Sequence, residues 1–552
     1  MRILILGGYG VFGGRLAELL LSVTDLEIII SGRDLNRAKD FCNTHNGNAA
    51  LTPLRLDRCE IGTQLTSIAP DIVVDASGPF QSYGHDGYAV IVACIKAKVN
   101  YLDFADATNF VFGVSRFDQE AKEAGVFVLS GASSFPVLTA CVLREMSKSM
   151  EVHSLKGGIA PSPYAGIGLN VMRAVIGYAG APITLLRDGK KVQALGLVET
   201  MRYTIAVPGK LPLKNIHFSL VDVPDLQVIP SEHSTLQSIW MGAGPVPEVL
   251  HRLLNLLART RAIFKFPSFV PFSRLFYWVL NLLKYGEHRG GMFIHAQGIS
   301  NDNPVEKSWH LLAEGDDGPY IPSMAIEAIV QKVRKREEPA AGARPATQAL
   351  ELEDYKNLFA GKSISMGFRG DENKQDTLFR SILAEAFEQL PEAVKAFHDS
   401  DGSRIWKGRA EVQRGSGFLA NLVCRIFGFP KNSRSSVVRV VQSQVEGGEQ
   451  WIRTFNDRSF NSILKIGLGK NSYLLTEQFG IVQMALALVL DKGKLHFVPR
   501  KCSVFSIPLP KILMPSGNSF EEEKDGLFIF HINIVAPIVG HIVSYKGFLE
   551  RG

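Results

Sequence analysis

The residues best suited to chemistry lie at the start of the chain, where an apolar run breaks into glycines. Residues 3–14 read Ile-Leu-Ile-Leu-Gly-Gly-Tyr-Gly-Val-Phe-Gly-Gly. A G-x-x-G-x-x-G or G-x-G-x-x-G turn between a buried strand and a helix lets the backbone approach a pyrophosphate, which the helix N-terminus then stabilises. We expect strands at 3–6 and 26–30 around a helix at 15–22. The predicted dinucleotide site comprises Gly7, Gly8, Tyr9, Gly10, Val11, Phe12 and Gly13.

The end of the second predicted strand indicates which dinucleotide is bound. Enzymes that use NAD usually place an acidic residue there, where it binds the ribose 2′-hydroxyl. This chain instead has Ser31, Gly32 and Arg33, followed by Asp34. A hydroxyl next to a guanidinium suits a 2′-phosphate, because the guanidinium can bind phosphate through two hydrogen bonds. Ser31, Gly32 and Arg33 therefore predict NADP, although Asp34 leaves NAD open.

A further cofactor segment follows the buried strand predicted at 71–76. Ser77, Gly78, Pro79 and Phe80 lie just past its carboxyl end, where open α/β sheets bind ligands. Gly78 permits close approach of the cofactor, Pro79 stiffens the turn, and Phe80 can cover an apolar ring. The structural alternative is an ordinary loop between a strand and a helix.

Three residues are candidates for moving a proton. Tyr101 and Asp103 lie at the end of another predicted strand, and a buried carboxylate there could act as acid or base. Asp103 could equally cap the helix that follows. His85 could donate a proton or cap the next helix. The six cysteines show no C-x-x-C spacing, so we expect neither a metal site nor a disulfide framework.

The distribution of apolar segments predicts three domains. Strand and helix signals alternate over 1–130, which predicts an α/β fold with a Rossmann-type, doubly wound parallel sheet. Residues 131–336 predict an α+β substrate or dimerisation domain with an antiparallel sheet. Residues 337–375 are poor in large apolar side chains and predict an extended, mobile linker. Residues 376–552 predict a separate β-rich α+β domain that opens with a helix.

Composition excludes several classes of protein. The chain has 552 residues and a net charge of +6, which is too small a bias to predict nucleic-acid binding. It lacks a long uncharged apolar run and an N-terminal signal peptide, so we expect no membrane-spanning helix. The scattered cysteines fit a reducing compartment. The sequence therefore predicts a cytoplasmic protein, with peripheral contact to a membrane left open.

That contact would involve residues 247–284, where aromatic and leucine side chains are interleaved with arginines and lysines. This composition suits a surface that lies in a lipid interface. It also suits helices packed on the substrate domain, or a contact between two copies of the chain. The segment 418–429 is similar, with few charges.

Several stretches together resemble the saccharopine dehydrogenase-like (saccharopine reductase-like) NADP-binding oxidoreductases. They are residues 6–13, 73–80, 93–103, 131–136 and 315–322. Asp75 is a mild departure, since relatives more often have Asn there. The C-terminal domain resembles a module known only as a domain of unknown function, most clearly at 536–547.

The resemblance implies an NADP-dependent oxidoreductase, with hydride moving between NADP(H) and a substrate that the motifs do not identify. Some relatives are enoyl reductases that act on lipids, and the apolar segment 247–284 favours a hydrophobic or lipid-like substrate. Saccharopine-type amino-acid chemistry is the alternative within the family. A non-catalytic, membrane-associated NADP-binding scaffold is the alternative outside it.

Overall fold

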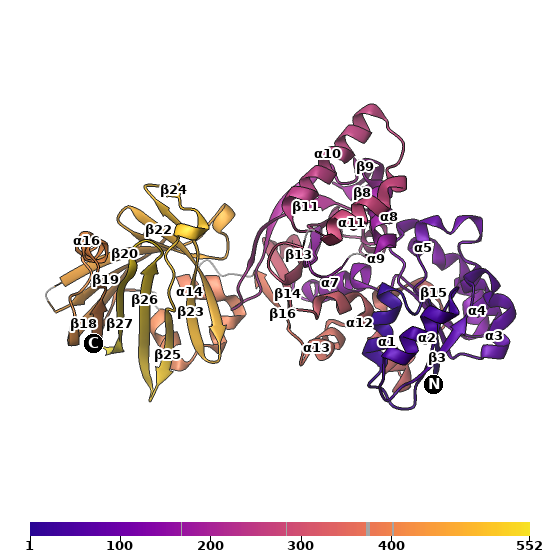
Figure 1. Ribbon diagram of the computed structural model, residues 1–552, viewed down its shortest axis with the longest axis horizontal. Coiled ribbons are helices and arrows are strands. Elements are labelled where there is room, and N and C mark those ends of the chain that lie inside the picture. The colour runs from indigo at the N-terminus through magenta and orange to yellow at the C-terminus, as the bar shows by residue number, and fades with distance from the viewer. Residues whose placement is uncertain (167, 283, 371–375, 400–401, 457) are drawn as a thin grey trace. The chain divides into compact units, whose positions relative to one another are not determined.

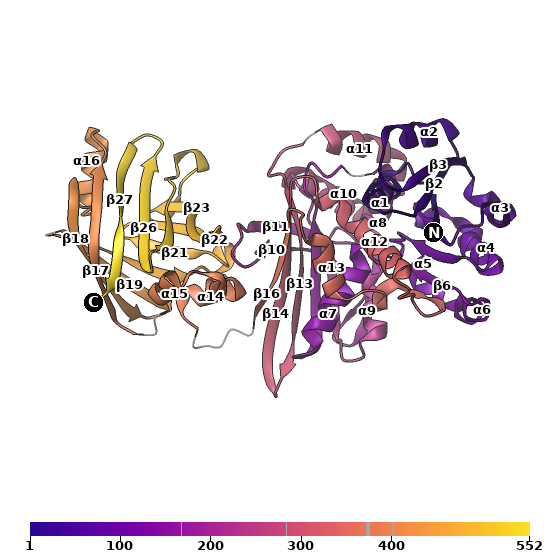
Figure 2. The same ribbon diagram turned by 90° about the horizontal axis from the view of Figure 1, so that it is seen from below.

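A computed structural model describes residues 1–166, 168–282, 284–370, 376–399, 402–456 and 458–552, apart from the side chains of His85 and Leu280 (Figures 1 and 2). The chain forms two compact units. The first contains Met1–Tyr203 and Ile216–Ser365, and the second contains Thr204–Asn215 and Met366–Gly552. The second unit therefore combines the domain predicted at 376–552 with a short segment from the middle of the chain.

The first unit contains the predicted parallel sheet. Its strands are β1 (Arg2–Leu6), β2 (Glu27–Gly32), β3 (Ala50–Arg55), β4 (Ile72–Asp75), β5 (Asn100–Asp103), β6 (Phe127–Ser130) and β15 (Gly342–Pro345). Their order is β15-β6-β5-β4-β1-β2-β3, which is the Rossmann order with one strand added. The connecting helices are α1 (Val11–Leu20), α2 (Leu35–Thr44), α3 (Ile61–Ile68), α4 (Ala89–Ala97), α5 (Thr108–Gly113) and α6 (Asp118–Ala124). β1 and β4 are buried along nearly their whole length, as expected for a sheet covered on both faces.

The added strand corrects the prediction of a mobile linker. Residues 342–345 form β15, which pairs in parallel with β6, and Ala343 is buried in the sheet core. The turn then leads into α13 (Leu352–Phe359), which begins with a capping box. Small residues such as Ala and Gly gave no strand signal here, because the sheet edge rather than the local sequence supplies the hydrogen bonds. Residues 371–375 lie outside the described part.

A second sheet completes the α+β region. Its order is β10-β11-β12-β7-β13-β14-β16, with strands β7 (Glu151–Ala160), β10 (Thr200–Ile205), β11 (Leu213–Leu220), β12 (Ser238–Ala243), β13 (Arg289–Ser300), β14 (Asn303–Glu314) and β16 (Ile364–Gly370). β7, β13 and β14 pair antiparallel, as predicted, whereas β12 and β7 pair in parallel, so the sheet is mixed. The remaining elements are α7 (Thr139–Ser147), α8 (Leu169–Tyr178), the hairpin β8 (Pro182–Arg187) and β9 (Lys190–Leu195), α9 (Asp225–Glu232), α10 (Glu248–Phe264), α11 (Ser273–Leu282) and α12 (Ile321–Arg334).

The second unit is an antiparallel β-barrel. Its strands are β17 (Arg404–Arg414), β18 (Ser433–Val445), β19 (Gly448–Phe455), β20 (Arg458–Ile466), β21 (Leu475–Phe479), β22 (Val482–Asp491), β23 (Lys494–Val504), β24 (Ile507–Pro508), β25 (Phe520–Lys524), β26 (Leu527–Ala536) and β27 (Gly540–Arg551). Pairing of β22 with β23 closes the sheet on itself, with β24 as a short addition. Because side chains alternate across a strand, every second residue faces the lumen. The β-rich character predicted for this region is confirmed.

Three helices accompany the barrel: α14 (Leu378–Leu383), α15 (Glu392–His398) and α16 (Phe418–Ile426). The single helix predicted at 376–390 breaks at Ala384, whose φ of 48° ends α14, and a 3-10 turn follows. The side chains of α14 and α15 join the barrel strands in one apolar core. In the described residues, no helix is both long and apolar enough to pass through a bilayer. The predicted fold class is confirmed.

Candidate functional site

The glycine turn joins β1 to α1 with its backbone held against β2. The amides of Gly7 and Gly8 both donate to the Ser31 carbonyl, at 2.9 and 3.0 Å. Gly7 has a φ of 73°, and a Cβ on Gly13 would lie 2.5 Å from the Gly7 oxygen. Only glycine fits both positions without displacing backbone. The helix begins at Val11 rather than at residue 15, so the free amides of its first turn belong to the predicted cofactor residues.

A groove of about 640 Å³ opens above this turn, at the carboxyl ends of the parallel strands. Nine predicted cofactor residues line it: Gly7, Tyr9, Gly10, Val11, Phe12, Gly32, Arg33, Ser77 and Gly78. The strand ends meet there because the chain reverses its direction of winding at β1, and this is where such sheets bind ligands. The helix amides and bare glycine backbone supply the anion-binding surface that a pyrophosphate requires.

Five predicted cofactor residues do not line the groove: Gly8, Gly13, Ser31, Pro79 and Phe80. Gly8 and Gly13 instead make close backbone contacts beneath the turn. Ser31 is fully buried and its hydroxyl donates to the Ile5 carbonyl at 2.9 Å, so that hydroxyl is not available to a phosphate. Phe80 packs against Tyr83 and Phe110. The alternation of a strand and the packing of its loop, which the motif alone does not specify, decide these orientations.

Two arginines stand at the end of the groove formed by β2. Arg33 and Arg37 both line it, and the Arg37 guanidinium lies 4.7 Å from the Tyr9 ring centroid. The Asp34 carboxylate instead caps α2, accepting from the amides of Asn36 and Arg37 at 3.0 and 3.2 Å. This acidic residue therefore stabilises the helix start. Of the charged residues that line the groove, Arg33, Arg37 and Arg58 outnumber Asp57, whose carboxylate accepts from the Cys59 amide. That arrangement suits a ribose 2′-phosphate.

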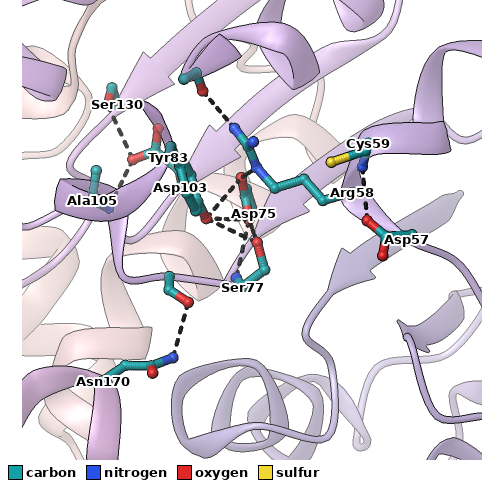
Figure 3. A network of polar contacts seen from close by, with 12 residues as sticks. Asp57, Arg58, Cys59, Asp75, Ser77, Tyr83, Asp103, Ala105, Ser130 and Asn170 are labelled. Carbon is teal, nitrogen blue, oxygen red and sulfur yellow. Dashed lines mark hydrogen bonds and ion pairs between the residues drawn. The ribbon is translucent and has the colours of Figure 1, made fainter. Parts of the chain in front are cut away.

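A buried polar network supports the middle of the groove (Figure 3). Asp75 is fully buried at the end of β4, and its Oδ2 lies 3.3 Å from Nε of Arg58. The Ser77 amide and hydroxyl donate to Asp75 Oδ1 at 3.0 and 2.5 Å. The Arg58 guanidinium also covers the Tyr83 ring at 3.5 Å, and burial raises the pKa of that phenol. The Arg58 guanidinium therefore balances the charge of the buried Asp75 carboxylate.

Sequence reasoning missed several groove residues: Arg37, Arg58, Tyr83 and Asn170. Arg58 follows the end of β3, and its place beyond a parallel strand was the signal that could have found it. Asn170, whose side chain donates to the Gly78 carbonyl at 2.9 Å, comes from α8 and lies far away in the sequence. No local pattern could have joined these two positions.

The residues present fit NADP. One groove combines three features. It has anion-binding amides, a glycine turn whose space any larger side chain would fill, and two arginines at the adenosine end. Arg33 and Arg37 would hold the 2′-phosphate, and the first turn of α1 would hold the pyrophosphate. When bound, the nicotinamide of this cofactor supplies or accepts a hydride.

Two of the predicted proton-transfer residues, Tyr101 and Asp103, do not line this groove. Asp103 is fully buried, accepts from the Ala105 and Gly131 amides at 2.9 and 2.7 Å and from the Ser130 hydroxyl at 3.1 Å, and so joins the ends of β5 and β6. Burial raises its pKa to about 7. Tyr101 is also fully buried. Neither lines the groove, and a catalytic role for them remains a prediction without support from position. The His85 side chain lies outside the described part.

A second cavity, of about 290 Å³, adjoins the cofactor groove within the first unit. The two voids share Val11, Phe12, Gly168 and Val171, at the starts of α1 and α8. The walls are predominantly apolar, and they include Met172, Val175, Leu254, Met292, Leu311 and Ile321. A molecule in this cavity would therefore lie next to one in the groove and would be surrounded by hydrocarbon.

Few polar side chains line the cavity. Arg15 donates to the carbonyls of Pro319 and Ala165 at 3.1 and 2.9 Å. His251 Nε2 lies 2.7 Å from the Ser219 hydroxyl, and burial together with His217 lowers its pKa to about 4, so it is neutral at pH 7. Burial raises the pKa of Tyr178, which keeps that phenol protonated. In the described residues, no group of His, Cys, Asp and Glu is placed to hold a metal ion.

Comparisons with known proteins agree with this geometry. Residues 3–129 match the family model described as "Saccharopine dehydrogenase NADP binding domain", so this part of the chain belongs to that domain family. The resemblance and the predicted NADP-binding domain are confirmed there. Residues 390–549 match a domain of unknown function, DUF4166. No curated protein is significantly similar to the chain.

The solved structures to which the chain is similar include several dehydrogenases. Saccharopine dehydrogenase (L-Glu forming) from Saccharomyces cerevisiae is 13% identical, with 67% of this chain and 99% of that one covered and a TM-score of 0.47. An amine dehydrogenase from Mycobacterium smegmatis is 10% identical, with 63% and 95% covered and a TM-score of 0.30. An engineered D-amino acid dehydrogenase bound to NADP+ is 13% identical, with 65% and 99% covered and a TM-score of 0.31. A shared substrate does not follow from such identities.

Proposed function

We propose that this chain, whose first 130 residues carry a saccharopine dehydrogenase-type NADP-binding domain, transfers a hydride between NADP(H) and a hydrophobic, lipid-like substrate. The observation that carries the proposal is the shared wall between the cofactor groove and the apolar cavity at Val11, Phe12, Gly168 and Val171. Hydride transfer requires the reacting atoms to be held in contact, and adjoining voids permit it. The enoyl group of a lipid is the substrate class that we favour.

The cavity walls favour this substrate over an amino acid. A saccharopine-type substrate carries several carboxylates, which would need converging cations in a buried site. Among the residues that line the cavity, Arg15 is the basic side chain, and two backbone carbonyls already accept its hydrogen bonds. A hydrocarbon chain needs no such cations, and burying each methylene contributes about 0.8 kcal/mol to the free energy of binding.

Two side chains on the cavity wall can exchange a proton with a substrate. Tyr178 is protonated and can donate, whereas neutral His251 can donate or accept according to its tautomer. Reduction of a carbon–carbon double bond needs one hydride and one proton, so a donor beside the nicotinamide would complete the reaction. These residues take the place of Tyr101 and Asp103 as our candidates, because they line the cavity.

Activity with a defined substrate tests the proposal. We expect the purified protein to consume NADPH with a long-chain 2-enoyl lipid and not with an α-amino dicarboxylate. Val175→Phe, which fills the cavity, should lower kcat/KM at least about tenfold while NADPH still binds. Val192→Phe, on the β8–β9 hairpin away from the cavity, is the matched control. Turnover of the dicarboxylate alone, or equal loss in both variants, would overturn the proposal.

We also propose that the surface formed by α10 and α11 contacts a membrane. Arg and Lys side chains alternate there with exposed large apolar ones: Val249, Leu253, Leu256, Ile263, Phe264, Phe266, Phe272, Leu275, Tyr277, Trp278 and Leu282. The opposite side of α10 is buried through His251, Asn255 and Ala258. Single exposed apolar residues are ordinary, but a patch of this extent indicates a contact surface. Leu254, on the same helix, lines the substrate cavity.

Flotation with vesicles tests this contact. The double substitution Ile263→Ser with Trp278→Ser should reduce the bound fraction several-fold without changing NADPH affinity. A homodimer through the same surface is the alternative. In that case the substitutions would convert a dimer to a monomer in light scattering and leave vesicle binding unchanged, which would overturn the membrane proposal.

A further inference from the structure

The barrel of the second unit encloses a cavity of its own. Its volume is about 130 Å³, close to that of an engineered apolar cavity of about 150 Å³ that takes up benzene. Inward-facing side chains form its walls, among them Phe397, Phe455, Met484, Leu486, Phe530 and Ile532. Such a volume holds part of a hydrocarbon chain and excludes a whole lipid.

Each charged side chain that lines the lumen has a partner: Arg453 pairs with Glu477, and Glu521 contacts His398. Arg453 donates to Glu477 at 3.0 Å and to the Ser462 hydroxyl at 2.7 Å, and Ser462 donates to Glu477 at 2.7 Å. The side chains of Arg453 and Glu477 are only 14% and 12% exposed. Because this pair carries no net charge, a charged head group would find no unbalanced partner inside. The lumen suits an uncharged chain.

The two ends of the barrel are built differently. At one end, α14 and α15 pack into the lumen, and the Ala393 amide donates to Glu523 at 2.8 Å. The strand register places the connections 415–432, 480–481, 505–519 and 537–539 together at the other end, which we call the loop end. Figure 2 shows α16 at this end and α14 and α15 at the opposite one. The cavity reaches towards the loop end at Pro515 and Ser516.

Exposed apolar side chains gather at the loop end. Phe418, Ile512 and Ile538 are 82%, 79% and 72% exposed, and they come from three separate connections. The complete set is Phe418, Leu419, Leu422, Ile426, Ile481, Phe505, Ile507, Ile512, Leu513 and Ile538. Segments far apart in the sequence thus present one kind of side chain where the lumen ends. A patch of this kind marks a contact with a hydrophobic partner.

Charge is divided between the two ends. Residues 412–445, 499–519 and 535–542 contain no Asp or Glu, but they contain the basic residues Arg414, Arg425, Lys431, Arg434, Arg439, Arg500, Lys501 and Lys511. Asp457 lies outside the described residues. The opposite end carries both signs, with Glu521, Glu522, Glu523 and Asp525 beside Lys492, Lys494 and Lys524. The apolar end is therefore the basic end, which complements an anionic bilayer.

A cluster of cations lies beside the loop end. The Lys214 ammonium is buried and has no hydrogen-bond partner by distance and angle among the described residues. Burial and then the neighbouring cations Lys501, Arg500 and Lys511 lower its pKa to about 7. Because these cations repel one another, their grouping indicates a surface that binds an anion.

We propose that the loop end of the barrel rests on an anionic membrane and that the lumen takes up part of one hydrocarbon chain of an anionic lipid. The exposed apolar side chains enter the interface, the basic residues contact the head groups, and the neutral lumen accepts the chain. This site belongs to the second unit alone, so it can be tested independently of the NADP site.

Energy transfer from Trp451, which lines the cavity, tests the chain-binding step. The full chain is mixed with vesicles of phosphatidylglycerol that bear a fluorescent parinaroyl chain. We expect transfer in the wild type and its loss, to a quarter or less, in Ile532→Phe, which fills the lumen. Trp406 lies in the same core, so Trp451→Phe is combined with Trp406→Phe, and this pair should lose transfer as well. Ile529→Phe, outward-facing on the same strand, and Trp278→Phe, on the α10–α11 surface, are the matched controls. Unchanged transfer in Ile532→Phe with a native thermal transition would overturn the proposal.

Charge reversal tests the membrane as the source of the lipid. Lys501→Glu with Lys511→Glu should weaken binding to phosphatidylglycerol vesicles at least about tenfold, since each removed cation near an anionic surface is worth about 1 kcal/mol. Lys492→Glu, in the β22–β23 turn at the opposite end, is the control and should change binding little. Equal effects of reversal at both ends would contradict the proposed orientation. Because NADPH binding uses the first unit, it should be unaffected in every variant, which separates this proposal from the enzymatic one.

Discussion

The cavities of the two units differ in how their polar groups are arranged. In the first, the groove is lined by hydrogen-bond donors, namely the amides at the start of α1 and the arginines beside β2. In the second, the charged side chains inside the barrel already pair with one another, as Arg453 does with Glu477. A site prepared for an anionic cofactor leaves its polar groups unsatisfied. A site prepared for hydrocarbon satisfies them and offers apolar walls.

The cavities differ in their neighbours as well. The apolar cavity of the first unit shares Val11 and Phe12 with the cofactor groove, so a bound molecule can be exposed to chemistry. The barrel lumen is bounded by its own strands and by α15, and it has a basic, apolar end. We therefore propose that the first unit carries out the reaction and that the second takes up a lipid chain without reacting with it. Substitutions that act on one unit and leave the other unchanged test this division.

The largest expected effect comes from breaking the ion pair in the barrel. Arg453→Met leaves Glu477 buried without its cation, which should lower the free energy of unfolding of the barrel by about 3 kcal/mol. Urea unfolding followed by Trp451 fluorescence measures this change. The double variant Arg453→Met with Glu477→Gln should recover much of the loss, because no unpaired charge remains. A double variant as unstable as the single one would show that packing, not charge, dominates.

The next effect should appear in the cofactor turn. A Cβ on Gly13 would lie 2.5 Å from the Gly7 oxygen, so Gly13→Ala should weaken NADPH binding about ten- to a hundredfold. Gly62→Ala is the matched control, because its Cβ would meet nothing closer than 3.8 Å. Calorimetric titration with NADPH measures both. Energy transfer to the parinaroyl chain in the barrel should be unchanged in both variants. If Gly13→Ala bound NADPH as tightly as Gly62→Ala, our placement of the pyrophosphate would be contradicted.

A smaller and more selective effect is expected at the 2′-phosphate. Arg33→Ala removes one charge-assisted contact and should weaken NADPH binding about tenfold, with NADH binding changed little. Lys39→Ala, an exposed cation on α2, is the control for general electrostatics. A titration in which NADPH and NADH compete gives the ratio of the two affinities. A parallel loss of NADPH and NADH would mean that Arg33 does not contact the 2′-phosphate.

The smallest effect should be a pH dependence of membrane binding. With a pKa of about 7, Lys214 carries its charge below that pH and loses it above, while Lys501, Arg500 and Lys511 are the cations that face it. Affinity for phosphatidylglycerol vesicles should therefore fall as pH rises through 7, by at most about fivefold. Lys214→Arg stays protonated over this range and should flatten the profile. The opposite slope in the wild type would contradict the assignment.

The sequence alone established the cofactor turn, because glycine spacing between a buried strand and a helix depends on local backbone geometry. It also located most of the barrel strands, whose alternating side chains record their own period. It did not reveal that Ser31 faces the core or that Asp34 caps α2. Both findings depend on the direction in which a side chain points from the end of a strand or the start of a helix. A sequence motif does not specify that direction for the residues next to it.

Only the tertiary structure determined what the motifs face. Residues 342–345 became a strand because the edge of β6 lacked a hydrogen-bonding partner, a requirement that their own composition does not express. Asn170 reached Gly78, and the connections at Phe418, Ile512 and Ile538 met at one end of the barrel, through pairings across long stretches of chain. A sequence specifies local conformation and periodicity directly. Which distant surfaces enclose a cavity follows from the packing that buries the most apolar surface.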